Sequence, residues 1–176
     1  MFFQKDKTDA EVRADLEKKL WDGLSSSSPF VMIGLKGVED SRTRPMTVQI
    51  EEVDGNKTIY FFADKRESIV EGITETHEAV ATFVSKGHDL FAHIHGNLVI
   101  DDDREVIDRL WNPMIAPWYE GNKDDPNLTL LRFDTGIANI WLNEGPEHLI
   151  KAALEALGKD VEKPDYEDKR ADVVLN

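Results

Sequence analysis

The segment PMTVQIEEVDGNKTIYFFA, residues 45–63, decides the fold class. In its first half apolar and polar residues alternate, and Met46, Val48 and Ile50 share one side of the pattern. This period of two is typical of a strand with one buried face. Asp54-Gly55 then indicates a tight turn into a second apolar strand, TIYFFA. The segment therefore predicts an antiparallel hairpin in the wall of a sheet or barrel.

The remainder of the chain alternates between predicted strands and helices. Thr8 and Glu11 fit a capping box that opens an N-terminal helix with apolar residues every four positions. Gly96, inside an apolar strand pattern, predicts a bulge or a close approach of two backbones. The elements together predict one α+β domain whose roughly seven, mainly antiparallel strands curl into a small barrel with flanking helices. Further strands are predicted at 30–36, 79–85, 90–100, 128–134 and 136–142, and further helices at 67–76, 103–111 and 147–157.

Chain length and composition are those of one domain. With 176 residues, 40% of them hydrophobic, the chain can bury one sizeable core. The predicted domain spans residues 1–158 and ends after Gly158, which is expected to stop the last helix. Residues 159–176 are charged and interrupted by proline, so we expect a loosely attached tail.

The charge of the chain excludes several kinds of partner. Acidic residues outnumber basic ones 35 to 21, and the net charge is -14. Binding to nucleic acid, or to an anionic membrane surface, depends on clustered Lys and Arg, so neither partner is expected. The sequence contains no cysteine, no signal-peptide pattern and no apolar run long enough to span a bilayer. These features predict a soluble, cytoplasmic protein.

Few residues suggest catalytic chemistry on their own. His93 and His95 share one face of a strand and could bind zinc or a haem iron. Most such pairs are half-exposed surface residues, and no Cys or second His pair is present to complete a site, so no metal is predicted. Asp124-Asp125-Pro126 is more typical of a turn than of a catalytic pair. No general acid, general base or nucleophile is identified.

Several short motifs, in this order and spacing, resemble those of the pyridoxamine-phosphate-oxidase-like split-barrel flavoproteins, specifically the bacterial general stress protein branch. The resemblance runs from about Trp21 to Trp141. It rests on Arg44-Pro45-Met46, on Ile59 to Ala63, on Asp103-Arg104 with 110–113, and on the segments 118–121 and 124–128. It implies a split β-barrel and a homodimer, with FMN in each of two clefts at the subunit interface.

The resemblance also implies which residues contact the cofactor and a small-molecule ligand. Arg44 is suited to phosphate because a guanidinium makes bidentate hydrogen bonds with phosphate oxygens, although a solvated turn residue beside Arg42 is an equal alternative. Trp118 and Tyr119, in the aromatic- and proline-rich segment 111–128, would line the flavin cleft or the dimer interface. The implied cofactor contacts are Arg44, Pro45, Met46, Thr47, Phe62, Ala63, Asp64, Lys65, Arg66, Ser68 and Trp118.

The resemblance implies a second phosphate-binding segment besides Arg44, and here the chain departs from the family pattern. Family members usually carry Ser or Thr followed by a Ser-x-Lys motif, whereas this chain has Ala63, Glu67 and Ile69 at those positions. Either Lys65, Arg66 and Ser68 hold the phosphate with help from a helix N-terminus, or the phosphate site has decayed. The sequence leaves open whether FMN, FAD or another ligand is bound.

Two functions remain open at the level of sequence. One is an FMN-dependent oxidoreductase acting on an unidentified small substrate, in which the flavin supplies the redox chemistry. The other is a non-catalytic stress-response protein that binds a flavin or another ligand. The enzyme hypothesis depends on family analogy because no catalytic residue can be named.

Overall fold

The computed structural model describes residues 7–26, 29–143, 153–159 and 169–175. Its helices are α1 (Asp9–Leu24), α2 (Ser68–Glu71) and α3 (Arg104–Leu110), with the 3-10 turns η1 (Glu39–Ser41), η2 (Ala116–Trp118) and η3 (Asn122–Asp124). Its strands are β1 (Phe30–Leu35), β2 (Arg44–Thr47), β3 (Gln49–Val53), β4 (Asn56–Asp64), β5 (Thr76–Val84), β6 (Leu90–Ile100), β7 (Leu128–Leu142) and β8 (Arg170–Val174).

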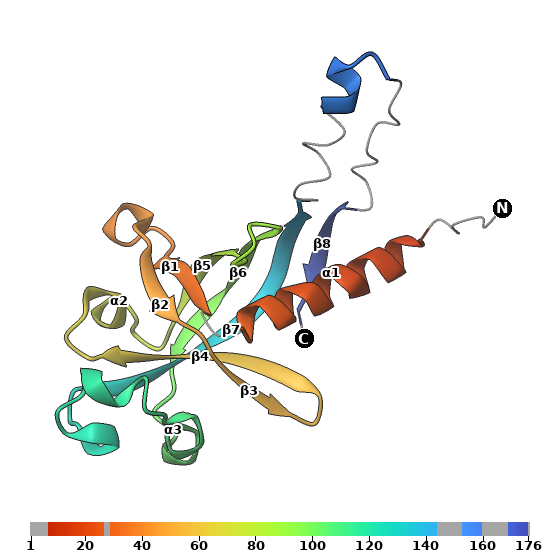
Figure 1. Cartoon of the computed structure of the whole chain (residues 1–176). Helices are drawn as coiled ribbons and strands as arrows, with labels where there is room; N and C mark the ends of the chain where they lie inside the picture. The colour runs from red at the N-terminus through yellow and green to blue at the C-terminus, as the bar shows by residue number, and fades with distance from the viewer. Residues whose placement is uncertain (1–6, 27–28, 144–152, 160–168, 176) are drawn as a thin grey trace.

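All eight strands join one antiparallel sheet in the order β2-β1-β5-β6-β7-β4-β3, with β8 added beside β7 (Figure 1). The two ends of this order, β2 and β3, are consecutive in the chain and separated only by Val48. The sheet therefore curls until its two ends come together at this residue. The α+β class and the split-barrel architecture predicted from the sequence are confirmed.

The hairpin that decides the fold forms as predicted between β3 and β4. Val53 pairs with Asn56. Asp54 and Gly55 take up the turn with φ values of 51° and 82°, and positive values at both central residues are what a type I′ hairpin requires. Met46 and Val48 are buried in the barrel. The predicted strand at 45–53 is interrupted, however, because the Val48 N–H donates to the carbonyl of Pro29 at 2.8 Å.

The strand β7 corrects the prediction of two strands at 128–134 and 136–142. Its first half pairs with β4 and its second half with β8, while β6 lies on its other side along most of its length. The turn-like residues Thr135-Gly136 thus mark a change of partner within one strand. The predicted irregularity at Gly96 is confirmed, since the register shifts there and a Cβ would lie 2.4 Å from the Asp134 carbonyl oxygen.

The helix α1 begins at the predicted capping box and covers one side of the barrel. Thr8 Oγ1 accepts from the Glu11 N–H at 3.3 Å, and Glu11 Oε2 accepts from the Thr8 N–H at 2.8 Å. The helix packs against β6, β7 and β8 (Figure 1). Its buried residues are Val12, Leu16, Leu20, Trp21 and Leu24, which contain the predicted apolar stripe. None of the helices described is both long and apolar enough to cross a membrane.

The expectation of a loosely attached tail is wrong for its last described residues. Strand β8 pairs with β7 from Arg170 to Val174. Val173 and Leu175 are buried in the main core, and the Leu175 N–H donates to the Gly136 carbonyl at 3.0 Å. Of the predicted helix at 147–157, residues 153–156 are helical and residues 147–152 lie outside the described part.

A second, smaller hydrophobic cluster forms where α3 packs near β4 and β7. It contains Tyr60, Val106, Ile107, Leu128 and Leu130, with Phe62, Leu110, Trp111 and Tyr119 partly buried against it. Trp111 thus continues the apolar side of α3 as predicted. The helix predicted at 67–76 is shorter, because α2 is a single turn that ends at Glu71. Phe62 and Tyr119 of this cluster also line the candidate site.

Candidate functional site

A cleft of about 350 Å³ lies where β2, the end of β4 and the turn η2 meet. Strand alternation decides which side chains reach it, because Phe62 and Asp64 line the cleft while Ala63, between them, is buried in the barrel core. The cleft is lined by Pro45, Met46, Thr47, Phe62, Asp64, Glu67, Ile115, Trp118 and Tyr119. The structure therefore brings six of the implied contacts together here: Pro45, Met46, Thr47, Phe62, Asp64 and Trp118.

Aromatic side chains form one wall of the cleft and stabilise one another. The rings of Phe62 and Trp111 meet edge to face, with centroids 5.6 Å apart. Trp111 in turn lies 6.0 Å from Tyr119. Trp118, by contrast, is 81% exposed at the cleft margin. The aromatic residues of 111–128 thus divide between packing and an exposed ring that remains available to a ligand or partner.

The loop that carries these aromatics is held by charged side chains. Arg104 donates to the Lys123 carbonyl at 2.8 Å and to Asp124 Oδ1 at 2.6 Å. Lys123 Nζ reaches Asp108 at 2.7 Å. Asp125 accepts from the N–H groups of Gly121 and Asn127, so its carboxylate shapes a turn, as the sequence indicated. These contacts therefore hold the loop that carries the exposed Trp118 in place.

Arg44 does not line the cleft and lies in a polar network with Ser68 and Glu39. Its Nη1 donates to Ser68 Oγ at 3.0 Å, and its Nη2 forms a close ion pair with Glu39. Arg44 precedes Pro45 and Ser68 follows Glu67, and both of those neighbours line the cleft. Arg44 Nε is buried and is the one buried side-chain donor without a partner among the described residues. Arg44 is therefore not a solvated turn residue, and it retains an unused donor.

The other two candidate cations are turned to carboxylates of the chain itself. Arg66 makes a fork-like pair with Asp64, with its Nε 2.9 Å from Oδ1 and its Nη2 2.5 Å from Oδ2. This pair, with a further bond from the Arg66 N–H, lowers the pKa of Asp64 to about 2. Lys65 Nζ lies 3.9 Å from Asp102. Neither Lys65 nor Arg66 lines the cleft.

Glu67 and Ile69, at the positions where the resemblance implies a Ser-x-Lys motif, lie in different environments. Glu67 lines the cleft. Ile69 is 1% exposed and belongs to the main core, so its side chain points away from the cleft. The absence of a lysine at position 69 therefore does not leave a gap in the cleft wall. The single turn of α2 is too short to supply a helix dipole of consequence.

Tyr119 adds a neutral hydrogen-bonding group. Loss of water around its ring, followed by the nearby negative charge of Glu67, raises the pKa of Tyr119 above its ordinary value. The phenol therefore stays protonated at neutral pH and can donate a hydrogen bond. The cleft therefore combines apolar and aromatic side chains with the acidic side chains of Asp64 and Glu67.

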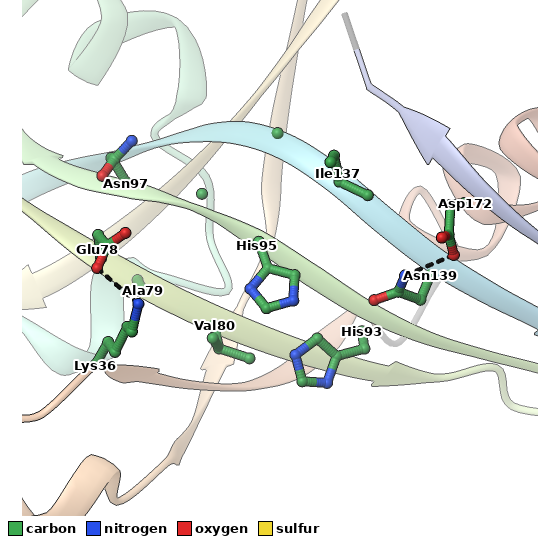
Figure 2. A pocket seen from close by; sticks show the side chains of 12 residues that line it. Lys36, Glu78, Ala79, Val80, His93, His95, Asn97, Ile137, Asn139 and Asp172 are labelled. Carbon is green, nitrogen blue, oxygen red and sulfur yellow. Dashed lines mark hydrogen bonds and ion pairs between the residues drawn. The ribbon is translucent and has the colours of Figure 1, made fainter.

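A larger hollow of about 710 Å³ lies elsewhere, on the outer face of β5, β6, β7 and β8 (Figure 2). His93 and His95 lie side by side on β6 with ring centroids 4.6 Å apart. Other polar side chains in the hollow pair with each other, Lys36 with Glu78 at 3.0 Å and Asn139 with Asp172 at 2.6 Å. Among the residues described, no group of three His, Cys, Asp or Glu side chains is arranged for a metal ion.

Two residues of the site were not anticipated from the sequence. Ile115 lines the cleft, and its place between Trp111 and Trp118 in the aromatic- and proline-rich segment could have indicated it. Glu39, which pairs with Arg44, lies in the turn η1. Nothing in the local sequence signals that pair, because it depends on how the β1–β2 connection folds back.

Comparison with known proteins identifies the family. The model of the pyridoxamine 5'-phosphate oxidase-like family matches residues 15–167. A protein described as general stress protein 26 from Jannaschia sp. CCS1 is 29% identical, with a TM-score of 0.75 over 93% of this chain and 99% of the other. The general stress FMN/FAD binding protein of Xanthomonas citri is 49% identical, with a TM-score of 0.70 over 75% of this chain and 92% of the other.

Two further relatives carry the general stress description. A general stress family protein of Xanthomonas campestris pv. campestris is also 49% identical, with a TM-score of 0.69 over 75% of this chain and 90% of the other. General stress protein 26 of Bacillus subtilis is 33% identical over 46 residues, which span 26% of this chain and 32% of the relative's length. The resemblance seen in the motifs is confirmed, and the chain belongs to the pyridoxamine 5'-phosphate oxidase-like family.

Proposed function

We propose that the cleft binds a flavin, with FMN preferred over FAD. The observation that carries this proposal is the mixed lining of the cleft, in which Pro45, Met46, Phe62 and Trp118 supply apolar surface, together with the buried, unpaired Nε of Arg44, the residue before Pro45. A flavin needs a cleft of this kind for its ring and donors for its anionic tail. The Xanthomonas citri relative, described as FMN/FAD binding, supports the same ligand class.

The size of the cleft favours the shorter flavin. Ligand pockets usually measure roughly 300–1,000 Å³, so about 350 Å³ suits a single ring system and little more. FMN would place its ring there and direct its phosphate towards Arg44 and Ser68. The adenosine half of FAD would have to lie outside the cleft.

Individual residues of this chain would then have separate tasks. β2 is an edge strand of the sheet order, so one edge of its backbone can offer N–H and C=O groups to a ring. Phe62 and Trp118 would exclude water from the ring faces, and the Tyr119 phenol could donate to a ring oxygen or nitrogen. When bound, a flavin supplies hydride and electron transfer, for which the protein provides binding and orientation.

We further propose that the protein is an oxidoreductase acting on a small molecule. A non-catalytic flavin-binding role is the second candidate, because no general acid or base in the cleft is identified. The discriminating experiment is to load purified protein with FMN, reduce it with NADPH, and follow reoxidation by oxygen or a dye. Turnover above that of free FMN supports the enzyme. A bound flavin that is reduced no faster than free FMN would leave only the binding role.

The assembly proposed is a cytoplasmic homodimer. Exposed apolar side chains near the cleft support it: Phe30 and Met32 lie on β1 beside β2, and Met114 and Trp118 are 79% and 81% exposed. A second copy could cover these residues and complete the cleft. Light scattering should give about twice the monomer mass of 20.0 kDa. A monomer at micromolar concentration would rule out the dimer.

A further inference from the structure

The connection between β1 and β2 is built to hold one carboxylate in place. Three consecutive residues of the turn η1, Glu39, Asp40 and Ser41, have φ between 50° and 59°. Non-glycine residues rarely adopt this left-handed conformation, and the strain tends to occur at ligand clamps and switch regions. Ser41 Oγ fixes the turn by accepting from the Gly37 N–H at 2.9 Å.

A close backbone contact fixes where this turn lies. A Cβ on Gly34 would lie 2.3 Å from the Arg42 carbonyl oxygen, so the returning chain crosses β1 at a point where only glycine fits. The crossing leads directly into Arg44 at the start of β2. The strained turn and the close crossing together bring the Glu39 side chain to the guanidinium.

The Glu39 carboxylate engages the same two groups that a flavin phosphate would use. It pairs with Arg44 Nη2, while Ser68 accepts from Arg44 Nη1 at 3.0 Å. The nearby Ser68 hydroxyl, followed by the charge of Arg44, lowers the pKa of the Glu39 carboxyl despite its partial loss of water. Glu39 is therefore an anion at neutral pH, bound to a cation and close to a hydroxyl.

We propose that Glu39 is an internal competitor for Arg44 and Ser68, and that it sets the preference of the cleft for the charge of the flavin tail. This inference rests on the proposed flavin site. A phosphate dianion that reaches Arg44 meets the Glu39 carboxylate, with Glu67 on the cleft side as a further like charge. A flavin with an uncharged ribityl tail meets no such opposition. Glu39 thus weakens FMN relative to riboflavin, and phosphate binding requires the carboxylate to withdraw.

Asp40 provides a matched control for this proposal. It is the next residue of the same turn and has the same left-handed conformation, with φ of 56°. Its side chain makes no hydrogen bond or ion pair with any residue that the structure describes. Asp40→Asn therefore removes the same unit of charge as Glu39→Gln without touching Arg44. The glutamine amide can still accept from Ser68 and Arg44, so the turn should fold.

The test compares FMN and riboflavin titrations of the wild type, Glu39→Gln and Asp40→Asn by flavin fluorescence. We expect Glu39→Gln to raise the FMN-to-riboflavin affinity ratio by about tenfold, the change for one charge-assisted contact. Asp40→Asn should leave the ratio within about twofold of wild type, since an exposed charge is screened. An unchanged or lower ratio in Glu39→Gln would show that Glu39 only positions Arg44 and would overturn the proposal. Glu39→Ala replaces Glu39→Gln if circular dichroism shows misfolding.

A second measurement separates this inference from the proposed function. Inorganic phosphate should raise the thermal midpoint of Glu39→Gln more than those of the wild type and Asp40→Asn. If no variant binds flavin, the proposed function fails, and a phosphate response confined to Glu39→Gln still supports the internal competitor. If flavin binds but neither the ratio nor the phosphate response changes, the competitor is excluded and the flavin site stands.

Discussion

The cleft beside β2 and the hollow on the outer face of β5 to β8 differ in what their polar groups do. The hollow is about twice as large, 710 Å³ against 350 Å³, yet Lys36 pairs with Glu78 and Asn139 with Asp172 inside it. The cleft has aromatic side chains in its lining, and the residue before Pro45, Arg44, carries a buried guanidinium nitrogen without a partner. Volume alone would favour the hollow as a ligand site. The proposal of the cleft rests instead on the aromatic side chains and on the unused donor of Arg44.

The largest expected effect is a loss of stability when a charge is placed in the core beneath the cleft. Ile69→Lys should destabilise the fold by roughly 3–5 kcal/mol, because the side chain is 1% exposed and a buried charge without a partner is costly. Glu67→Ser, two residues earlier on the cleft surface, should change stability by less than about 1 kcal/mol. Urea unfolding of both variants measures the difference. A stable Ile69→Lys protein would mean that position 69 can face the cleft after all.

Removing the guanidinium tests whether the cleft, and not the hollow, holds the flavin tail. Arg44→Ala should weaken FMN binding about tenfold or more, since a charge-assisted hydrogen bond contributes roughly 1.5–3 kcal/mol. Lys36→Ala removes one positive charge from the hollow and serves as the control. Equal losses in the two variants would point to a general charge effect rather than a site at Arg44.

The exposed tryptophan gives a smaller effect of the same kind. Trp118→Ala should weaken FMN binding several-fold, in line with about 0.5–1.5 kcal/mol for an aromatic contact, and leave the circular dichroism spectrum unchanged because the ring is 81% exposed in the single chain. Ile137→Ala in the hollow, where the side chain is 50% exposed, should leave FMN affinity unaltered. A circular dichroism spectrum altered only in Trp118→Ala, with no change in affinity, would make the ring a structural element.

The smallest expected effect is a pH dependence of stability that arises from His93 in the hollow. Partial burial, followed by the neighbouring His95, lowers the pKa of His93 below 6.5, and Thr82 and Asn139 on the flanking strands add no opposite charge. The unfolded chain then binds the proton more readily, so stability should fall as pH drops through about 6.5. His93→Gln should flatten that slope in urea unfolding at pH 5 to 7. His77→Gln, whose ring in the wild type lies 2.9 Å from the Lys36 carbonyl, is the control, and identical slopes for the two variants would refute the assignment.

The parts of the fold that depend on local signals were predictable from the sequence. Thr8 with Glu11, Asp54-Gly55 and Gly96 each act within a few residues, and each was read correctly. The continuity of β7 was missed because Thr135-Gly136 has the composition of a turn, whereas its role is to let one strand exchange β4 for β8. The pairing of β8 was missed because no local pattern reveals a strand's partner.

The candidate site, like the fold, could be predicted only in part from the sequence. Pro45, Met46, Thr47, Phe62 and Trp118 could be assigned to one cleft from motifs, and the structure brings them together. The behaviour of the charges could not be predicted. Arg66 turns to Asp64, Lys65 to Asp102 and Arg44 to Glu39, and each pair depends on where the chain folds back. The sequence therefore predicted which apolar residues line the cleft, and only the structure showed which carboxylates the three cations pair with.

Titration of FMN into the purified wild-type protein tests the central claim most directly. We expect one site per chain, a shifted flavin absorption band, and quenching of tryptophan fluorescence that is weaker in Trp118→Ala. We also expect Arg44→Ala to shift the titration to higher FMN concentration while Lys36→Ala follows the wild type. Saturable binding lost in Lys36→Ala but retained in Arg44→Ala, or no binding of FMN at all, would contradict the account.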